Sequence, residues 1–348
     1  MSSSSQTTPL ISVVMGVHNE KDEYLRMALD SICNQTYKKI EVIIVDDCSN
    51  EGCKHTLSEY AKSFDFIRII HNKTNLGLTK SLNIGIHQSF GAFIARMDAD
   101  DYSVPTRIEK QVAFMTCNPD IDICGTGVVS FGDEVEYMSP FRGISNGEAQ
   151  SYLFFSSTLC HPSVLIRKSF LDEHHLLYDE NVKRGQDYDL WERSSIYGKL
   201  AVLKEVLLFY RLHAAQITSS HRDEQNFSAD RIRLRRLSRI GISPSDKEYE
   251  CHMLLGGAVN LSHSVQDVRL WIDNLITANA SKGLVDNDVF AKDLRNRFVL
   301  FKLRNHHYVA LVRICDIICL IKILFDRLLM KQSLKREINK FQNLIENV

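Results

Sequence analysis

Three carboxylates stand within four residues at the end of an apolar stretch, in the segment GAFIARMDADDYSVP (residues 91–105). Asp98, Asp100 and Asp101 directly follow a run that has the character of a buried β-strand. Like charges this close repel one another, and removing them from water is costly unless a positive group offsets both effects. Two interpretations follow: a site for a bound cation, or a solvated acidic turn without a chemical role.

The spacing of Asp98 and Asp100, a D-x-D pattern, suits a hard divalent cation. Carboxylate oxygens prefer Mg²⁺, Mn²⁺ or Ca²⁺ to softer metals. Mg²⁺ usually keeps several waters and is held by one or two carboxylates together with substrate phosphates. The pattern therefore predicts a metal that in turn binds a diphosphate, but D-x-D is frequent by chance and needs support from the elements around it.

Strands and helices alternate over the first 130 residues, which predicts an α/β fold with helices on both faces of a mostly parallel sheet. The expected strands are ISVVMGV (11–17), EVIIV (41–45), FIRII (66–70) and AFIARM (92–97). Ligands bind outside the carboxyl ends of the strands in such sheets. The polar residues that follow these strands are His18, Asn19, Glu20, Asp46, Asp47, Cys48, Ser49, Asn50, Asn72, Asn75, Gly77, Asp98, Asp100 and Asp101.

Each of these residues, taken singly, is equally well explained as a turn residue or a helix cap. Their recurrence after four strands favours a binding site at one edge of the sheet.

Length and composition describe a globular chain of 348 residues, enough for a catalytic domain with an appendage. We expect a flexible N-terminus (1–9), an α/β domain (10–220) and a helical C-terminal region (221–348). The formal net charge of -1 argues against a nucleic-acid-binding protein. Nine scattered cysteines without a C-x-x-C pair favour reduced thiols in a cytosolic protein over disulfides or a zinc site.

The polar N-terminus lacks the layout of a signal peptide, and no run of about 18 uncharged apolar residues predicts a spanning helix. The nearest approach is YVALVRICDIICLIKILF (308–325), which Arg313, Asp316 and Lys322 interrupt. Two interpretations are open for this segment: a buried helix of the C-terminal region, or a contact with a membrane surface or membrane-bound partner.

Six segments carry a resemblance to a known family. They are ISVVMGVHNE, IEVIIVDDCSNE, NLGLTKSLNIGI, AFIARMDADDYSVPTRIEKQ, HPSVLIRK and GQDYDLWER. In order and spacing the sequence resembles the family 2 glycosyltransferases over roughly residues 10–215, and the ordered set is specific. These are inverting enzymes that use nucleotide-sugar donors. The resemblance implies a GT-A (Rossmann-like) fold, a mixed and mostly parallel sheet flanked by helices, followed here by a helical C-terminal region.

The resemblance also implies roles for the residues at the strand ends. The nucleotide-sugar pocket would contain Val17, His18, Asn19, Glu20, Asp47, Asn75, Gly77, Arg96 and Asp98. Asp98 would face the ribose or the metal, Asp100 would ligate a Mn²⁺ or Mg²⁺ ion, and His213 would be a third metal or phosphate ligand. The residues themselves leave alternatives open: Asp47 as a helix N-cap, Arg96 as the partner of an aspartate, and His213 as a structural histidine.

The transfer itself needs a base for the acceptor hydroxyl. The family offers an E-D pair at the start of a helix, and this sequence has Gln186-Asp187 at that place. The resemblance implies that Asp187 is the base, although a carboxylate at a helix N-terminus is also favoured by the helix dipole alone. His161, Gln186 and Trp191 are the expected residues of the acceptor side.

We therefore expect an inverting enzyme that moves a single sugar from a UDP-sugar to a hydroxyl of a glycan or lipid-linked oligosaccharide in polysaccharide biosynthesis. Processive members carry a Q-x-x-R-W motif and several spanning helices, which this sequence lacks. The expected location is cytoplasmic, or peripheral at the inner face of the cell membrane. The donor sugar, acceptor, linkage and oligomeric state stay open.

Two other classes compete. A non-catalytic sugar-nucleotide-binding or scaffold protein would explain Gln186 in place of the usual acid. A sugar nucleotidyltransferase has a similar outline but carries a glycine-rich phosphate loop after its first strand, and GVHNEKDEY contains no such loop.

Overall fold

The structure is a computed structural model that describes residues 8–132, 137–139, 141–213, 222–258, 261, 263–305 and 314–345. The chain divides into two compact units, which are treated separately below. The first comprises residues 1–144 and 159–222, and the second comprises residues 145–158 and 223–348.

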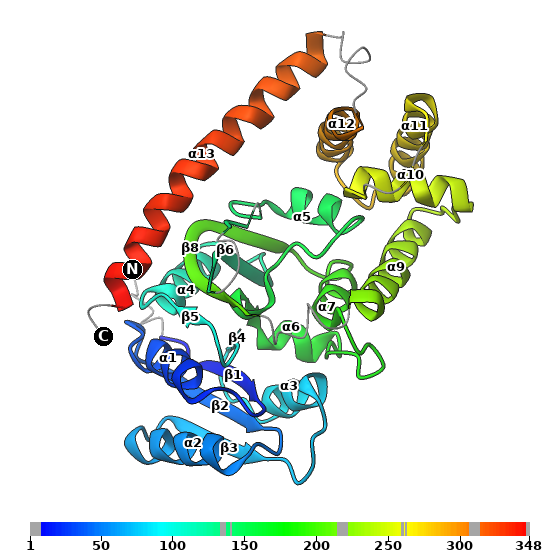
Figure 1. Ribbon diagram of the computed structural model, residues 1–348. Coiled ribbons are helices and arrows are strands. Elements are labelled where there is room, and N and C mark those ends of the chain that lie inside the picture. Colours follow the sequence, from blue (N-terminus) through cyan, green and yellow to red (C-terminus); the bar gives the residue numbers. More distant parts are fainter. Residues whose placement is uncertain are drawn as a thin grey trace, which may run out of the picture. The chain divides into compact units, whose positions relative to one another are not determined.

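The first unit is built on one sheet of eight strands in the order β3-β2-β1-β4-β7-β6-β8-β5 (Figure 1). The strands are β1 (Ile11–Val17), β2 (Ile40–Asp46), β3 (Ile67–His71), β4 (Phe93–Arg96), β5 (Tyr102–Ser103), β6 (Ile123–Gly132), β7 (Leu165–Arg167) and β8 (Leu200–Leu212). Strands β1 to β4 are parallel, as are β6 and β8. β7 runs antiparallel to β4 and β6, and β5 runs antiparallel to β8. The predicted mixed, mostly parallel α/β fold is confirmed.

Helices of the first unit connect these strands and bury one face each. They are α1 (Asp22–Cys33), α2 (Glu51–Ser63), α3 (Leu78–His87), α4 (Arg107–Cys117), α6 (Lys168–Glu173) and α7 (Gln186–Ser194), with a 3₁₀ turn, η1, at His161–Ser163. In α1 the buried Leu25, Leu29 and Ile32 recur at helical spacing and pack on Met15 and other apolar residues of the central strands. The predicted alternation of apolar strands and amphipathic helices thus produces the core.

The second unit is helical. It contains α5 (Asn146–Tyr152), α9 (Arg222–Arg239), α10 (Asp246–Gly256), α11 (Val265–Lys282), α12 (Asn287–Arg304) and α13 (Ile314–Ile345). Its core includes Phe154, Leu254, Trp271, Leu275 and Phe290. The sequence begins three of these helices with capping boxes, at Ser145, Ser245 and Ser264.

Residues 145–158 fall within the range expected for the catalytic domain, but in the structure they belong to the second unit. Buried polar groups hold them there. Arg236 Nη2 donates to the carbonyl of Gln150 at 2.9 Å, and His252 Nε2 lies 2.8 Å from the carbonyl of Phe154. The hydroxyl of Ser151 donates to Asp293 at 2.7 Å. These bonds join parts of the chain that are far apart in sequence, so no local pattern predicted them.

The apolar segment 308–325 lies partly outside the described residues, since the structure describes nothing between Asn305 and Ile314. The first part of this segment, and residues 1–7 of the expected flexible N-terminus (1–9), lie outside the described residues. The two interpretations of the segment stay open. In the ranges that the structure covers, no helix combines the length and the apolar character needed to cross a bilayer.

The close approach of α3 to β1 depends on Gly85. A Cβ atom at this position would lie only 2.5 Å from Val14 Cγ1, whereas a Cβ at Gly52 in α2 would meet nothing closer than 3.4 Å. α3 begins at the strand-end loop that contains Gly77, so this contact also positions the site described below.

Gly85→Ala should lower the free energy of unfolding by about 1–3 kcal/mol, because the added methyl overpacks the α3–β1 contact. Gly52→Ala is the matched control and should raise it by about 0.5 kcal/mol through the reduced freedom of the unfolded chain. Urea unfolding of both variants measures the difference. Equal stability of the two variants would show that α3 can move away from β1 without cost.

Candidate active site

The parallel strands bring the predicted polar residues to one edge of the sheet. Val17 at the end of β1 is in register with Asp46 at the end of β2, which in turn is in register with His71 at the end of β3. The loops that follow these strands are therefore neighbours, and each supplies side chains to the same region.

Asp47 organises this edge. Its Oδ1 accepts hydrogen bonds from Asn72 Nδ2 at 2.8 Å and from the backbone N–H of Leu76 at 2.7 Å. Its Oδ2 accepts from the backbone N–H of Gly77 at 2.7 Å. Asp47 is almost fully buried, and Gly77 has φ +87°, a conformation that favours glycine. The Asp47 carboxylate thus holds the loop 72–77; the cap of α2 is instead Asn50, which accepts from the N–H of Cys53.

His18 joins the first strand-end loop to this arrangement. Its Nδ1 lies 2.8 Å from the backbone oxygen of Asp47, which can only accept, so Nδ1 carries the proton. Nε2 is then an acceptor, and the side-chain amides of Asn75 and Asn19 lie 3.0 and 3.1 Å from it. These three residues form a polar, solvent-exposed rim beside Asp47.

Val17 differs from the other predicted pocket residues. Its side chain is 2% exposed and belongs to the core. Its backbone oxygen accepts from the N–H of Asp47 at 2.8 Å. The role of Val17 in the nucleotide pocket stays a prediction, and it would be a role of the backbone.

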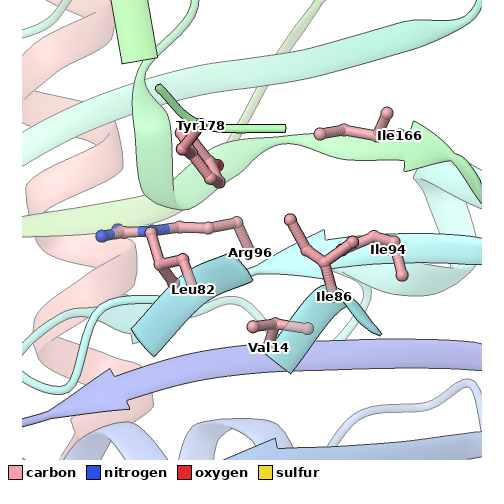
Figure 2. A pocket seen from close by; sticks show the side chains of 7 residues that line it. All are labelled: Val14, Leu82, Ile86, Ile94, Arg96, Ile166 and Tyr178. Atoms are coloured by element: carbon pink, nitrogen blue, oxygen red, sulfur yellow. The ribbon is translucent and has the colours of Figure 1, made fainter. Parts of the chain in front are cut away.

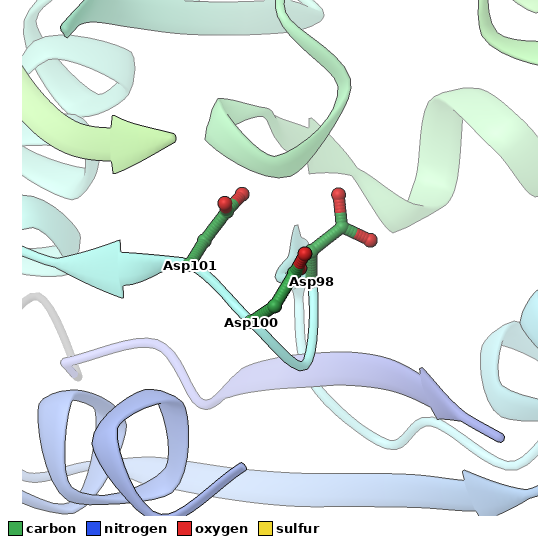
Figure 3. A group of neighbouring side chains, drawn as sticks. All are labelled: Asp98, Asp100 and Asp101. Atoms are coloured by element: carbon green, nitrogen blue, oxygen red, sulfur yellow. The ribbon is translucent and has the colours of Figure 1, made fainter. Parts of the chain in front are cut away.

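The acidic cluster is the second part of the site. Asp98, Asp100 and Asp101 rise from the segment that joins β4 to β5, and Figure 3 shows them as near neighbours. Each offers a carboxylate oxygen, and these three oxygens lie within 4.8 Å of one another. His213, which follows β8, lies with Nε2 3.2 Å from Asp100 Oδ2. The D-x-D pattern and the distant histidine are thus brought together.

Burial raises the pKa of Asp100 to about 6, and the charges of Asp98 and Glu20 add to this effect, while His213 opposes it. Asp101 is fully buried, and burial followed by the charges of Asp100 and Asp98 holds its pKa well above the ordinary value. Asp101 Oδ1 accepts from the backbone N–H of Arg211 at 2.8 Å. Its Oδ2 is buried and has no hydrogen-bond partner in the described part of the chain.

This donor set fits a hard divalent cation. Carboxylate oxygens and one imidazole converge, the pKa values of Asp100 and Asp101 are raised, and one buried oxygen of Asp101 has no donor among the described residues. A bound cation would reverse the penalty that raises these pKa values.

Arginine side chains supply positive charge next to the acidic cluster. Arg96, 3% exposed, forms an ion pair with Asp98, which is the pairing that the sequence left open. Arg211 Nε donates to the backbone oxygen of Asp100 at 2.8 Å, and its guanidinium stacks on Tyr24 with 3.9 Å to the ring centre. Arg107 is fully buried and donates to the backbone oxygen of Arg96 at 3.2 Å.

The sequence patterns did not identify Arg107 and Arg211 as residues of the site. A signal existed for Arg211, because side chains two apart in a strand share a face and His213 was already a candidate. No local pattern identified Arg107, which reaches the site from α4 through tertiary packing.

Seven side chains line a small, mainly apolar cavity. Figure 2 shows them: Val14, Leu82, Ile86, Ile94, Arg96, Ile166 and Tyr178. Aliphatic side chains from β1, α3, β4 and β7 dominate, so the cavity has few of the polar groups that a nucleotide requires. The carboxyl edge of the sheet remains the candidate site.

The acceptor-side residues form the third part. His161 Nε2 lies 2.7 Å from the hydroxyl of Tyr178, and its ring meets Trp191 edge-on with 6.2 Å between ring centres. Trp191 is fully buried in the core, so it supports His161 from below and presents no stacking face. Gln186 and Asp187 begin α7 after Gly185, which has φ +71°, and both are half-buried.

Cys160 and Tyr178 are two further titratable groups near the site. The pKa of the Cys160 thiol is raised by burial and then by the charges of Asp101 and Asp98, with a smaller contribution from Asp187. The pKa of Tyr178 is raised by burial, with added contributions from Asp187 and Asp98.

Comparison with known proteins gives consistent matches. The family model described as glycosyl transferase family 2 matches residues 12–175. An uncharacterized glycosyltransferase of Haemophilus influenzae is 32% identical over 68% of this chain and 77% of that protein. The O-antigen biosynthesis glycosyltransferase WbnJ of Escherichia coli is 31% identical over 59% of this chain and 80% of its own. The crystal structure of S. aureus TarS 1–349 in complex with UDP-GlcNAc has a TM-score of 0.58 and 17% identity, over 85% of this chain and 92% of that one; it shows a shared fold.

The raised pKa of Asp100 predicts that the metal-free protein loses stability as the pH rises. The unfolded chain releases this proton near pH 3.8 and the folded chain near pH 6, so folding takes up a proton between these values. The free energy of unfolding therefore falls through this window, by up to about 3 kcal/mol for Asp100 alone. Asp100→Asn should remove that contribution.

Urea unfolding in a chelator, at about pH 4 and about pH 7, measures the effect. Asp65→Asn, a change of the same type at an exposed carboxylate of the first unit, is the control and should keep the wild-type pH dependence. If Asp100→Asn kept that dependence as well, Asp100 would not be the group that titrates.

Proposed function

The chain belongs to glycosyltransferase family 2, and we propose that it transfers one sugar, with inversion, from a UDP-sugar to a hydroxyl of a glycan or lipid-linked oligosaccharide. One observation carries the proposal: carboxylate oxygens of Asp98, Asp100 and Asp101 converge within 4.8 Å of one another after β4, and His213 lies 3.2 Å from Asp100. The O-antigen biosynthesis relative supports a role in polysaccharide biosynthesis, and the UDP-GlcNAc complex of TarS supports the donor class.

The nucleotide would bind beside Asp47. Backbone N–H groups of Leu76 and Gly77 fix this carboxylate, so it is preorganised to accept a further hydrogen bond, such as that of the uracil N–H. His18, Asn19 and Asn75 present polar atoms on the neighbouring rim and are suited to the ribose hydroxyls.

Asp98, Asp100 and His213 would hold the divalent cation, Mn²⁺ or Mg²⁺, with Asp101 beneath them. When bound, the cation supplies positive charge against the nucleoside diphosphate that leaves. The chain's own contribution is to fix the ligands. Arg211 donates from Nε to the backbone oxygen of Asp100 and from its backbone N–H to the carboxylate of Asp101, and Arg96 pairs with Asp98.

Asp187 would take the proton of the acceptor hydroxyl. Burial and the charge of Arg96 hold the pKa of His161 well below its usual value, and burial keeps the proton on Tyr178. These two side chains also satisfy one another, so they form a neutral wall. Asp187 supplies a carboxylate on this side, the type of group that can accept this proton.

The cation and the nucleotide should bind together. Calorimetry with UDP should detect binding in Mn²⁺ that weakens at least about tenfold in a chelator, because the carboxylates would hold a cation whose charge attracts the diphosphate. Asp100→Asn should lose this dependence on Mn²⁺. The exposed Asp65→Asn should retain it, and UDP affinity that ignores the chelator would contradict the assignment of the acidic cluster.

Asp187→Asn should slow the release of UDP from UDP-sugars in Mn²⁺ by about 10²–10⁴-fold, since the amide cannot accept the proton. UDP affinity should stay unchanged, which separates catalysis from binding. The neighbouring Gln186→Ala is the control and should retain most of the rate.

Equal rates for wild type and Asp187→Asn would remove Asp187 from the base role. Firm UDP binding by the wild type without any turnover would favour the non-catalytic alternative instead.

A further inference from the structure

One side chain of α3 holds the loop that leads to Asp187. Asn83 is buried, and its amide makes a reciprocal pair of hydrogen bonds with a single loop residue, Tyr178. Asn83 Nδ2 donates to the backbone oxygen of Tyr178 at 2.9 Å, and Asn83 Oδ1 accepts from the backbone N–H of Tyr178 at 3.1 Å. Two bonds to one residue fix both the position and the orientation of that part of the backbone relative to α3.

The loop itself, residues 174–185, joins α6 to α7 without a further helix or strand. Next to Tyr178, the backbone oxygen of Leu177 accepts from Arg193 Nη2 of α7 at 2.7 Å. Consecutive loop residues are therefore bonded to α7 and to α3. Since Asp187 stands in the first turn of α7, the bonds of Asn83 help to determine where this carboxylate lies.

α3 is a firm support for this loop. Gly85 allows the helix to lie directly against β1, where a Cβ atom would meet Val14. The helix begins directly after Gly77, whose backbone N–H donates to the buried carboxylate of Asp47 at 2.7 Å. A strand-end loop and the loop before α7 are thus attached to the same helix.

Tyr178 in turn holds His161, because its hydroxyl lies 2.7 Å from His161 Nε2. The ring of Tyr178 lines the small cavity of Figure 2 together with Leu82 and Ile86 of α3. Close packing does not fix the ring on the side of the cavity, so the bonds from Asn83 to its backbone provide more of the restraint.

A second contact between α3 and the loop contributes less. Lys80 Nζ lies 3.8 Å from Glu180 Oε2, and about half of each side chain is exposed. Exposed ion pairs contribute little because water and salt screen them, whereas removing a buried amide leaves its partners unsatisfied. Asn83 is therefore the residue of α3 whose loss should release the loop.

We propose that Asn83 is a positioning residue for the transfer reaction. It acts through the loop, without contact with donor or acceptor, and places Asp187 and the His161–Tyr178 pair for the incoming hydroxyl. The inference rests on the proposed function, because that function gives Asp187 the role of base.

The second unit contains a matched asparagine. Asn279 of α11 is buried, its Nδ2 donates to the backbone oxygen of Val285 at 2.8 Å, and its Oδ1 accepts from the N–H of Val285 at 3.0 Å. In both cases Nδ2 also meets a side-chain oxygen, of Glu180 or of Asn287. Asn83 and Asn279 bind in the same way but hold different loops, so only an effect specific to Asn83 supports the proposal.

Hydrogen exchange tests the physical part without donor or acceptor. In Asn83→Ala, the peptide that contains Tyr178 should exchange at least about tenfold faster than in the wild type, because its N–H loses an acceptor. The peptide that contains Val285 should exchange as in the wild type. Asn279→Ala should give the reverse pattern, and protection of the Tyr178 peptide that survives Asn83→Ala would overturn the proposal.

The rate of UDP release from UDP-sugars in Mn²⁺ tests the functional part. Asn83→Ala should lower kcat by about 10–100-fold because the base is displaced, while UDP affinity stays within about twofold of the wild type. Asn83→Asp keeps the acceptor for the Tyr178 N–H and should retain more of the rate, and it replaces Asn83→Ala in every measurement if the alanine variant does not fold. Asn279→Ala should keep the wild-type kcat.

A double-mutant cycle separates positioning from a general loss of structure. In the Asp187→Asn background, Asn83→Ala should lower kcat by less than about threefold, because the group that it positions has already been removed. An undiminished effect in this background would overturn the proposal, as would an equal loss of kcat in Asn279→Ala.

The outcomes distinguish this inference from the proposed function. A wild-type rate in Asp187→Asn would contradict the proposed function and, with it, the placing of a base by Asn83. A slow Asp187→Asn together with a wild-type kcat in Asn83→Ala would contradict the role of Asn83 alone.

Discussion

Repulsion among the three carboxylates after β4 is the constraint on which the site depends. One oxygen of each carboxylate lies within 4.8 Å of the others. Asp100 and Asp101 are also largely removed from water, and both effects raise the pKa values of these two residues. Three groups offset part of that cost. Arg96 forms an ion pair with Asp98, and the N–H of Arg211 donates to Asp101. The imidazole of His213 contacts Asp100. A divalent cation would offset the rest, which gives a physical reason for the cluster.

The same constraint explains why distant segments meet here. Arg211 and His213 come from the end of β8, more than a hundred residues after the acids, and β8 reaches them by pairing with the short β5 that follows the acidic loop. On the nucleotide side a single carboxylate, Asp47, fixes the loop 72–77 in the same manner, by accepting backbone N–H groups. Both halves of the site are thus held by hydrogen bonds between segments that are far apart in the chain.

The second unit includes residues 145–158, a segment from within the range 10–220 that was expected to form the catalytic domain. Residues 145–158 leave the first unit after Ile144 and return at Leu159, just before Cys160 and His161. Arg233 and Arg236 of α9 and His252 of α10 bind the carbonyls of this segment, so part of the charge of α9 has an internal structural role.

Gln186, the departure from the usual acid pair, lies beside Asp187 at the start of α7, so this position carries one carboxyl group in place of two.

The sequence by itself determined the alternation of strands and helices, the strand ends and the polar residues beyond them, because these depend on periodicity and on turn chemistry within a few residues. It also pointed to the D-x-D acids, His213 and Asp187. Only the tertiary structure decided that Asp47 holds the loop 72–77, that Val17 and Trp191 are buried, that Arg96 pairs with Asp98, and that Arg107 and residues 145–158 lie where they do. These outcomes depend on the strand order and on which buried polar group finds which partner, and both are set by contacts between residues far apart in the chain.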